Sequence, residues 1–574
     1  MVAMKLRQKY LVAFLLLLNV VAFIYLVIQN THLHENRAVR RYTEMIFSLA
    51  QIPKGASKYH DASQIDQTGK HVPLTWRLVE DSDVVSPLYR KLFQIRDHLL
   101  GYIKDYLDYE NLEYGVDASI LKYKSFANEG NIQKLEALLR EVLYTGRKIN
   151  IGVVGSSMSM AKSCSTENIF GKCMYAETVA RWLHLMTEAQ VELHNVALDS
   201  ANSEYYAWCL QPHLDVSNMD IILVEFAGVD YDIQDVYVRN SYVDTGRPLE
   251  DLTRQILSSA NAPFPIYINF PSIREIRNKN CINSEYYSQK LLAKHYFVTS
   301  VSWNVPFCPK LWHPKFLMSD VVDYDGQNPT AHVHKQIALL LVNTFRKLIL
   351  QMTEKEIQNA QSSTAYVKQM INDYYRYHGI STDDENPTSH DKSNEFSHGN
   401  VNKRTSYDAA NNVDLSKKLL APRFKDTWLS GAQCWPASQP QQIKNHSLQV
   451  YGTTPWRYTE YDSRAWWESD GKNEQITFSF TIQNKDNQTA VVAITKISCV
   501  TCGQAIVWLD NNFSSSTLIQ AKYPSAIFMV DEVAWKVAPG KHTINIKNME
   551  DKLFQVTAIM VGYKRTPFTK TGGR

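Results

Sequence analysis

The sequence KINIGVVG at residues 148–155 decides the fold, because this short apolar run ends in glycine and is followed by an amphipathic helical pattern. The same alternation of apolar runs and helical patterns continues to about residue 350. Short apolar strands that alternate with helices are typical of a parallel sheet covered by helices on both faces. The sequence therefore predicts a three-layer α/β/α domain at 148–352. The further predicted strands are VELHNVAL (191–198), DIILVEFA (220–227), PIYINFP (265–271) and FVTSVSW (297–303).

The segments on either side of this domain have other patterns. Apolar residues at helical spacing predict a helical lead-in at 87–147, after a polar stem at 29–86. Residues 353–425 are rich in polar residues and predict a flexible linker. Short β-branched runs separated by turn residues then predict an antiparallel β-sandwich at 426–566.

Residues 10–28, YLVAFLLLLNVVAFIYLVI, carry no charge and are long enough to cross the hydrocarbon core of a membrane. Lys5, Arg7 and Lys9 precede them and favour a cytoplasmic tail at 1–9. We predict a transmembrane signal anchor and a single-pass type II membrane protein. Its remainder would face the lumen of the secretory pathway (ER or Golgi) or the cell surface. A cleaved signal peptide is the alternative.

Eight cysteines agree with an oxidising compartment, although sequence alone leaves their pairing open. Cys499 and Cys502 lie in a strand-like run, so a local or cross-strand disulfide is favoured over zinc binding or redox chemistry. Asn445, Asn487 and Asn512 each begin an N-x-S/T sequence and are candidate glycosylation sites.

The charge balance, 61 Lys and Arg against 58 Asp and Glu, provides no broad basic surface. Nucleic acid is therefore not a predicted partner. Aromatic residues make up 11% of the chain, which is too many for a mainly disordered protein. The sequence contains no G-x-S-x-G, Walker A or H-E-x-x-H motif, and we predict no cofactor and no metal.

Ligands of parallel sheets bind beyond the carboxyl ends of the strands. The first predicted strand ends at Gly155, and Ser156 and Ser157 follow it directly. A serine in a tight turn after a strand is where a nucleophile with an exposed hydroxyl would lie. Gly-Ser-Ser is also ordinary turn chemistry, so this turn alone leaves both interpretations open.

Blocks between about residues 148 and 350 resemble, in order and spacing, the SGNH or GDSL-type esterase superfamily, in particular its large eukaryotic membrane-anchored branch. The resemblance implies a flavodoxin-like α/β/α domain that hydrolyses acyl esters, with acetyl groups on glycans as the expected substrate. The matching blocks are IGVVGSSMS (151–159), YAETVARWL (175–183), NVA (195–197), EFAGVD (225–230) and DGQNPTAHVH (325–334).

The resemblance also assigns roles within the site. It places Ser157 as the nucleophile, Asp325 as the acid that orients the base, and the Ser157 and Ala197 amides in the oxyanion hole. Val229 stands where the family has its oxyanion Asn, and Asn328 where it has the base His. Loss of one oxyanion donor costs roughly 10²–10³ in rate, and an amide cannot accept a proton near neutral pH. We therefore predict weak or no esterase activity.

His332 is a candidate replacement for the missing base, because it lies one helical turn after Asn328. A helix histidine that faces solvent or is satisfied within the fold is the favoured interpretation. His334 matches a second His of the family that looks structural. Asn328 and Pro329 also fit the N-cap and the first position of the closing helix.

Two other functions stay open. The chain could be a catalytically silent module that binds a glycan or a protein, or a lumenal glycosyltransferase. Asp-x-Asp pairs at 81–83, 230–232 and 323–325 are compatible with a cation and nucleotide phosphates, but such pairs also arise by chance. Sandwich tryptophans could stack on sugar rings or fill the core. They are Trp435, Trp456, Trp466, Trp467 and Trp508.

Overall fold

The computed structural model describes most of residues 85–362 and 430–563, which belong to one compact unit, Arg77–Arg574. The predicted signal anchor and stem, and most of the predicted linker, lie outside the described residues. Within the described residues, no helix is long and apolar enough to cross a membrane. The gaps inside the two ranges are 101, 118–119, 122–125, 161–172, 238–245, 282–283, 286–288, 314–316, 324–327, 438–447, 453–454, 462–463 and 484–489.

The predicted parallel sheet is confirmed. Its strand order is β1-β6-β5-β4-β2-β3, and the pairs among β2 to β6 are all parallel. Every residue of β4 is buried, as expected for a strand covered on both faces. The five strands are β2 (Ile149–Gly155), β3 (Val191–Asn195), β4 (Ile221–Glu225), β5 (Phe264–Asn269) and β6 (Thr299–Ser302).

An additional edge strand, β1 (Phe126–Asn128), was not predicted. It pairs antiparallel with β6. With three residues it is too short to show a period-2 pattern in the sequence.

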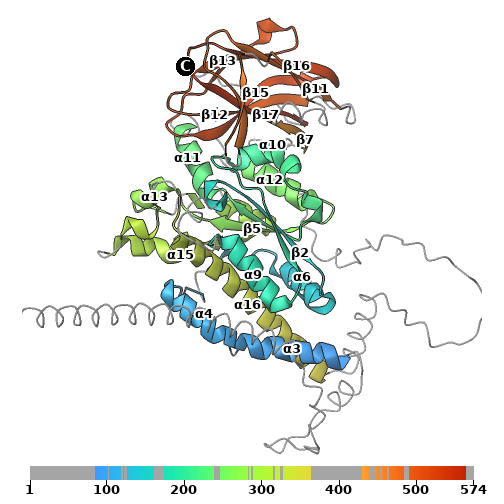
Figure 1. Cartoon of the computed structure of the whole chain (residues 1–574). Helices are drawn as coiled ribbons and strands as arrows, with labels where there is room; N and C mark the ends of the chain where they lie inside the picture. Colours follow the sequence, from blue (N-terminus) through green and yellow to red (C-terminus); the bar gives the residue numbers. More distant parts are fainter. Residues whose placement is uncertain are drawn as a thin grey trace, which may run out of the picture. The chain divides into compact units, whose positions relative to one another are not determined.

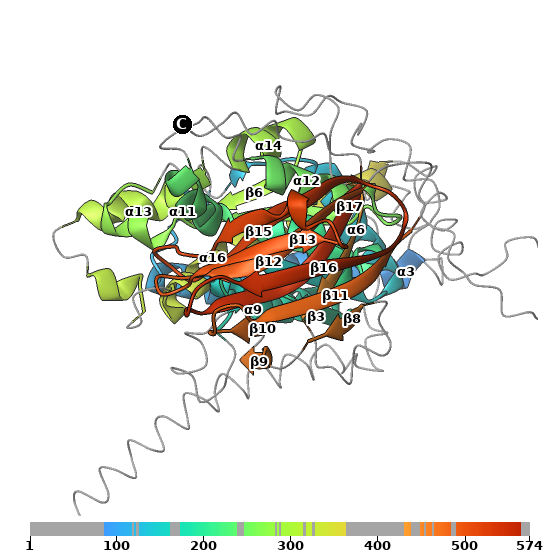
Figure 2. The same ribbon diagram turned by 90° about the horizontal axis from the view of Figure 1, so that it is seen from above.

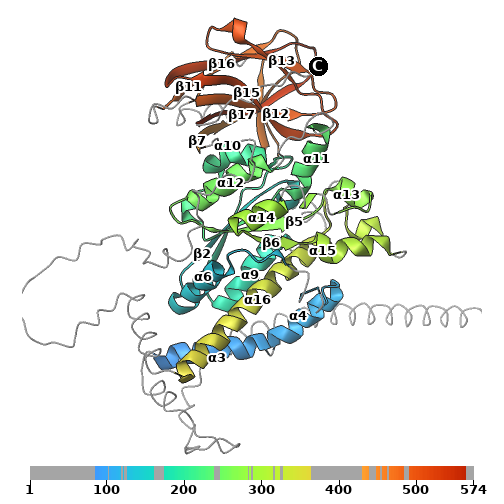
Figure 3. The ribbon, with the colours of Figure 1, turned by 180° about the vertical axis from the view of Figure 1, so that it is seen from behind.

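Helices cover both faces of the sheet (Figures 1 and 3). On one face α9 and α16 pack into a core that also contains residues of α3 and α6. On the other face α10, α12 and α14 enclose a second core, which is rich in aromatic residues. The helices are α3 (Val85–Leu100), α4 (Tyr102–Glu113), α6 (Ile132–Thr145), α9 (Tyr175–Thr187), α10 (Ser203–His213), α12 (Arg247–Ser258), α14 (Lys290–Tyr296) and α16 (Ala331–Ser362).

The start of α16 corrects one prediction. Asn328 does not cap this helix: Pro329 forms a β-bridge with Val322, and the helix begins at Ala331. Thr330 takes the capping position instead, since its hydroxyl accepts the Val333 amide at 3.4 Å. The helix also continues to Ser362, beyond the predicted end of the domain.

The predicted antiparallel β-sandwich is confirmed, and Figure 2 shows it from above. One sheet has the order β15-β12-β17-β10-β9, with β7 beside β17, and the other the order β14-β13-β16-β11-β8. Apolar residues of both sheets meet in one core. The strands are β7 (Ser430–Pro436), β8 (Gln449–Tyr451), β9 (Arg457–Tyr461), β10 (Arg464–Ser469), β11 (Gln475–Ile482), β12 (Ala490–Ser498), β13 (Gln504–Leu509), β14 (Thr517–Gln520), β15 (Ile527–Val537), β16 (Gly540–Asn548) and β17 (Phe554–Tyr563).

The sandwich tryptophans that might have stacked on sugars are mostly core residues. Trp435, Trp456, Trp466 and Trp467 are at most 9% exposed. Trp508 packs edge-on against Phe513, with 5.1 Å between the ring centroids. Core packing therefore accounts for four of these side chains, whereas Trp508 is half-buried against the exposed Phe513.

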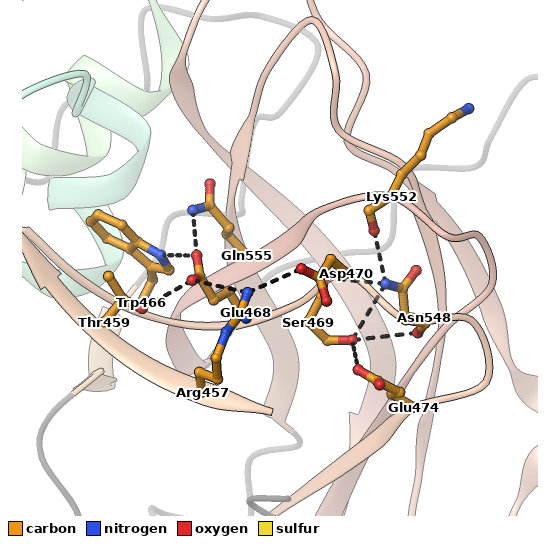
Figure 4. A network of polar contacts seen from close by, with 11 residues as sticks. Arg457, Thr459, Trp466, Glu468, Ser469, Asp470, Glu474, Asn548, Lys552 and Gln555 are labelled. Carbon is orange, nitrogen blue, oxygen red and sulfur yellow. Dashed lines mark hydrogen bonds and ion pairs between the residues drawn. The ribbon is translucent and has the colours of Figure 1, made fainter. Parts of the chain in front are cut away.

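A polar network fastens three strands of the sandwich together (Figure 4). The Glu468 carboxylate of β10 accepts hydrogen bonds from the Trp466 indole at 2.7 Å, Thr459 of β9 at 3.0 Å and Gln555 of β17 at 3.0 Å. Trp466 belongs to the apolar core shared with α10. The network therefore fixes a side chain of the contact between sandwich and α/β domain.

Disulfides reinforce the described structure. Cys209–Cys434 joins α10 of the α/β domain to β7 of the sandwich, and Cys281–Cys308 joins two loops beyond β5 and β6. Cys499–Cys502 is the predicted local disulfide.

Candidate functional site

The parallel topology brings three predicted site residues to one rim of the sheet. Ser157 follows β2, Ala197 follows β3, and Val229 lies in α11 (Ala227–Tyr237), which follows β4. Because parallel strands point the same way, these residues lie at their carboxyl ends. The fourth, Asn328, precedes α16, and its carbonyl accepts the Asp323 amide at 2.8 Å. Asp325 lies outside the described residues.

Ser157 begins the short helix α7 (Ser157–Met160) and is half-buried. Gly155 is required for the tight turn before it, because a Cβ there would lie 2.5 Å from the Ser159 Oγ. Among the described residues, no imidazole forms a hydrogen bond with the Ser157 hydroxyl. The turn brings the side chains close together, but in the described part of the chain no base is hydrogen-bonded to the predicted nucleophile.

A buried carboxylate, Glu225 at the end of β4, holds this turn. Its Oε2 accepts the Ser156 amide at 3.2 Å, the Ser156 hydroxyl at 2.9 Å and the Ser159 hydroxyl at 3.2 Å. Ser159 also bonds the Tyr175 hydroxyl of α9 at 2.9 Å. Burial raises the pKa of Glu225 to about 7, against the opposing effect of the serine hydrogen bonds. The family resemblance places Glu225 in the block EFAGVD (225–230) but assigns it no role.

Asp230 is a second buried acid near Glu225. Its Oδ1 accepts the backbone amide of Ser203, the first residue of α10, at 3.0 Å. A carboxylate is favourable at a helix N-terminus, but burial raises the pKa of Asp230 to about 7. Asp230 thus ties the helix after β4 to the helix after β3.

The Ala197 amide, predicted to stabilise an oxyanion, already has an acceptor. It donates to the Asn195 Oδ1 at 3.0 Å, and the Asn195 Nδ2 donates to the Ser159 carbonyl at 3.0 Å. Asn195 therefore links the loop after β3 to the serine turn. An incoming oxyanion would have to displace this side chain before it could use the Ala197 amide.

Val229 has a packing role. Its side chain lies against Tyr523, Ile527 and Met529 of the sandwich. The Tyr523 hydroxyl adds a hydrogen bond to the carbonyl of Asp232, also in α11, at 3.2 Å. An apolar residue suits this contact, because a polar amide there would lose hydration.

The sandwich also holds the loop that follows β3. Arg464 of β10 pairs with Asp199 at 3.1 Å, and both side chains are largely buried. The Phe528 amide of β15 donates to the Ser200 carbonyl at 2.9 Å, and Asn202 Nδ2 donates to the Phe528 carbonyl at 2.9 Å. Both rim segments with predicted oxyanion positions are therefore in contact with the second domain.

The two histidines of α16 face different surroundings. The His332 ring is exposed, lies 5.0 Å from the Tyr114 ring, and its Nε2 is 3.2 Å from the Gln336 Nε2. His334, two positions later, is rotated by roughly 200° around the helix. It is buried and stacks on Tyr175 at 6.0 Å, and burial lowers its pKa to about 4. The histidine that reaches the Tyr175–Ser159 pair is thus His334, and a role for His332 remains a prediction.

A polar groove of about 600 Å³ runs beside the edge strand β3 and ends at Asn195 and Val196. Its lining does not include Ser157.

Of the candidate glycosylation sites, Asn512 is exposed and its Oδ1 accepts the Ser514 hydroxyl at 2.6 Å. Asn445 and Asn487 lie outside the described residues. The described part of the chain has no group of three or more His, Cys, Asp or Glu that could hold a metal ion.

Compared by sequence, the chain matches no protein-family profile and no curated protein. It is similar in structure to a two-domain esterase active on acetylated mannans, with 13% identity, 78% of this chain and 100% of that chain covered, and a TM-score of 0.48. An acetyl xylan esterase from Geobacillus stearothermophilus has 16% identity over 35% of this chain and 94% of that chain, with a TM-score of 0.28. A family two carbohydrate esterase from Cellvibrio japonicus has 19% identity over 24% and 36%, with a TM-score of 0.16.

Proposed function

We propose that the chain is a membrane-anchored SGNH hydrolase-like protein with weak or no activity on acyl esters of glycans. The observation that carries this proposal is the bond from the Ala197 amide to Asn195, since it occupies a donor that the reaction needs. Val229 supplies no side-chain donor and packs against the sandwich instead. Together these features remove most of the charge stabilisation that an acyl-transfer transition state requires.

Proton transfer is the second deficit. A serine nucleophile needs a base within hydrogen-bond reach. Among the described residues no base is hydrogen-bonded to Ser157, and the buried His334 stacks on Tyr175, which in turn bonds the Ser159 hydroxyl. Any residual hydrolysis would depend on attack by a hydroxyl with no positioned base, which is slow near neutral pH.

We also propose a lumenal or extracellular location, with residues 10–28 as the anchor. Three disulfides among the described residues support an oxidising compartment. Glycosylation at the exposed Asn512 would agree with this location.

A catalytically silent binding module is the second candidate, favoured by the intact packing around a degenerate site. The glycosyltransferase alternative has less support. Asp230 is 5% exposed and accepts the Ser203 amide, so it is not placed to share a cation with a nucleotide in solvent.

The proposal is tested by labelling the full chain, purified in detergent, with a fluorophosphonate probe. We expect slow labelling, close to that of Ser157→Ala, because no base among the described residues is hydrogen-bonded to this hydroxyl. Ser515→Ala serves as a control serine, because Ser515 is exposed and lies outside the Asn512 glycosylation sequence. Rapid and complete labelling of Ser157 would show an activated nucleophile and refute the weak-esterase proposal.

A further inference from the structure

Trp312 is the only exposed tryptophan among those whose side chains the structure describes, with 67% of its surface accessible. Tryptophan side chains are highly buried on average, so a large exposed indole calls for an explanation. The tryptophans of the sandwich, which are the other candidates for stacking on sugars, are largely buried. The exposed ring lies in the α/β domain.

Buried neighbours and a disulfide hold the turn that carries Trp312 in place. Trp312 ends η3 (Cys308–Trp312), which follows α15 (Asn304–Phe307). Phe307 and Leu311 are buried in the core, and Cys308 forms the disulfide with Cys281. In a 3₁₀-helix residues three apart share a face, so Cys308 and Leu311 point inward together and leave Trp312 outside. The geometry of this 3₁₀ turn therefore accounts for the exposure of the Trp312 indole.

A lysine ammonium is held over the same ring. The Lys279 Nζ lies 5.8 Å from the centre of the Trp312 ring. Lys279 follows α13 (Ile273–Arg277) and has φ 53°, a left-handed conformation that few non-glycine residues adopt. Cys281, two residues later, belongs to the disulfide that anchors η3. One cross-link thus joins the two chain segments that carry this pair.

Lys279 and Trp312 follow α13 and α15, two helices that come after β5 and β6 in the chain. Figure 1 shows α11, α13 and α15, the helices that follow β4, β5 and β6, at the same end of the sheet. Two strands, β4 and β5, separate β2 from β6. At ~4.8 Å per strand, the ends of β2 and β6 are roughly 14 Å apart. A ligand that extended from the end of β2 to the end of β6 would be longer than a single sugar ring.

We infer that Trp312 and Lys279 form a subsite for one pyranose ring of an oligosaccharide. The apolar C–H face of the sugar would stack on the indole, and the ammonium would donate a hydrogen bond to a hydroxyl or acyl oxygen of the ligand. The inference rests on the proposed function, because it names the carbohydrate-binding part of the same site. A bilayer surface is the competing occupant and is an outcome of the test.

The test titrates the full chain in detergent with the pentasaccharides of mannose, xylose and N-acetylglucosamine. Calorimetry measures the affinity, and quenching of tryptophan fluorescence by iodide shows whether the bound sugar shields an exposed indole. We expect binding of at least one pentasaccharide, with protection that is lost in Trp312→Phe. Trp312→Ala should weaken binding about tenfold, which corresponds to ~1.4 kcal/mol of stacking energy. Lys279→Ala should weaken it less. Tyr461→Ala, which removes a 60% exposed aromatic ring from the sandwich, is the matched control and should bind as wild type does.

Absence of binding to all three pentasaccharides, or binding that Trp312→Ala leaves unchanged, would overturn the inference. So would quenching of Trp312 by brominated lipid when the chain is reconstituted in vesicles, since this would place the ring in the bilayer. Failure of the proposed function gives a different signal, namely rapid fluorophosphonate labelling of Ser157 with the saccharide titrations unaffected.

Discussion

Glu225→Gln should flatten the dependence of stability on pH, because Glu225 is a buried acid whose pKa differs between the folded and unfolded chain. Burial raises this pKa from 4.5 to about 7, a difference worth about 3 kcal/mol. A carboxyl group with a raised pKa contributes full stability below its unfolded pKa and loses it as the pH rises through the folded pKa. Between pH 4.5 and 7.5 the ionising Glu225 should therefore lower the free energy of unfolding by about 3 kcal/mol.

The assay is thermal unfolding of the full chain in detergent, followed by tryptophan fluorescence from pH 4.5 to 7.5. About 3 kcal/mol corresponds to roughly 6–12 °C in Tm for a domain of this size. The wild-type Tm should fall by this amount more than that of Glu225→Gln, whose amide can still accept the serine hydrogen bonds. Glu129→Gln, at an exposed carboxylate, is the control and should follow the wild type. Parallel curves for wild type and Glu225→Gln would refute the buried-acid explanation.

Three further substitutions test the contacts around the site. Gly155→Ala should destabilise the chain by about 1–3 kcal/mol in urea unfolding, because its Cβ would lie 2.5 Å from the Ser159 Oγ; an unchanged midpoint would contradict the packing of the turn. Val229→Asn should lower the free energy of unfolding by about 1–3 kcal/mol, since the amide would enter the apolar contact with the sandwich. It should not increase ester hydrolysis. A marked gain in turnover would show that this position still faces the substrate. Replacing Cys209 and Cys434 together by Ala should lower the free energy of unfolding by about 2–5 kcal/mol and increase proteolysis between the domains. If the variant resists protease as well as wild type does, the disulfide does not hold the two domains together.

Strands β2, β4 and β5 could be predicted because each is a short, mainly apolar run, whereas β3 and β6 were placed by the apolar residues that flank them. The edge strand at Phe126–Asn128 could not, because its three residues take their structure from the neighbouring β6. The cap of α16 was assigned to Asn328 on local propensity, but the bridge between Val322 and Pro329 delays the helix to Ala331. In that case a tertiary contact outweighed the local signal.

The candidate site was predictable in position but not in its contacts. The order of the strands places Ser157, Ala197 and Val229 at one rim, which follows from the topology alone. The bond from Ala197 to Asn195 depends on a side-chain rotamer. The packing of Val229 against Tyr523 depends on a domain almost three hundred residues later. Pairings of this kind leave no local pattern in a single sequence.

Turnover of p-nitrophenyl acetate by the purified full chain tests the central claim most directly, with wild type compared against Ser157→Ala at neutral pH. Because no described base is hydrogen-bonded to Ser157 and the Ala197 amide is engaged, wild type should exceed the variant by less than about tenfold, against the ~10²–10⁴ that a positioned base contributes. Rapid turnover by wild type that Ser157→Ala abolishes would contradict the account, and would require a base among residues that now contact other groups.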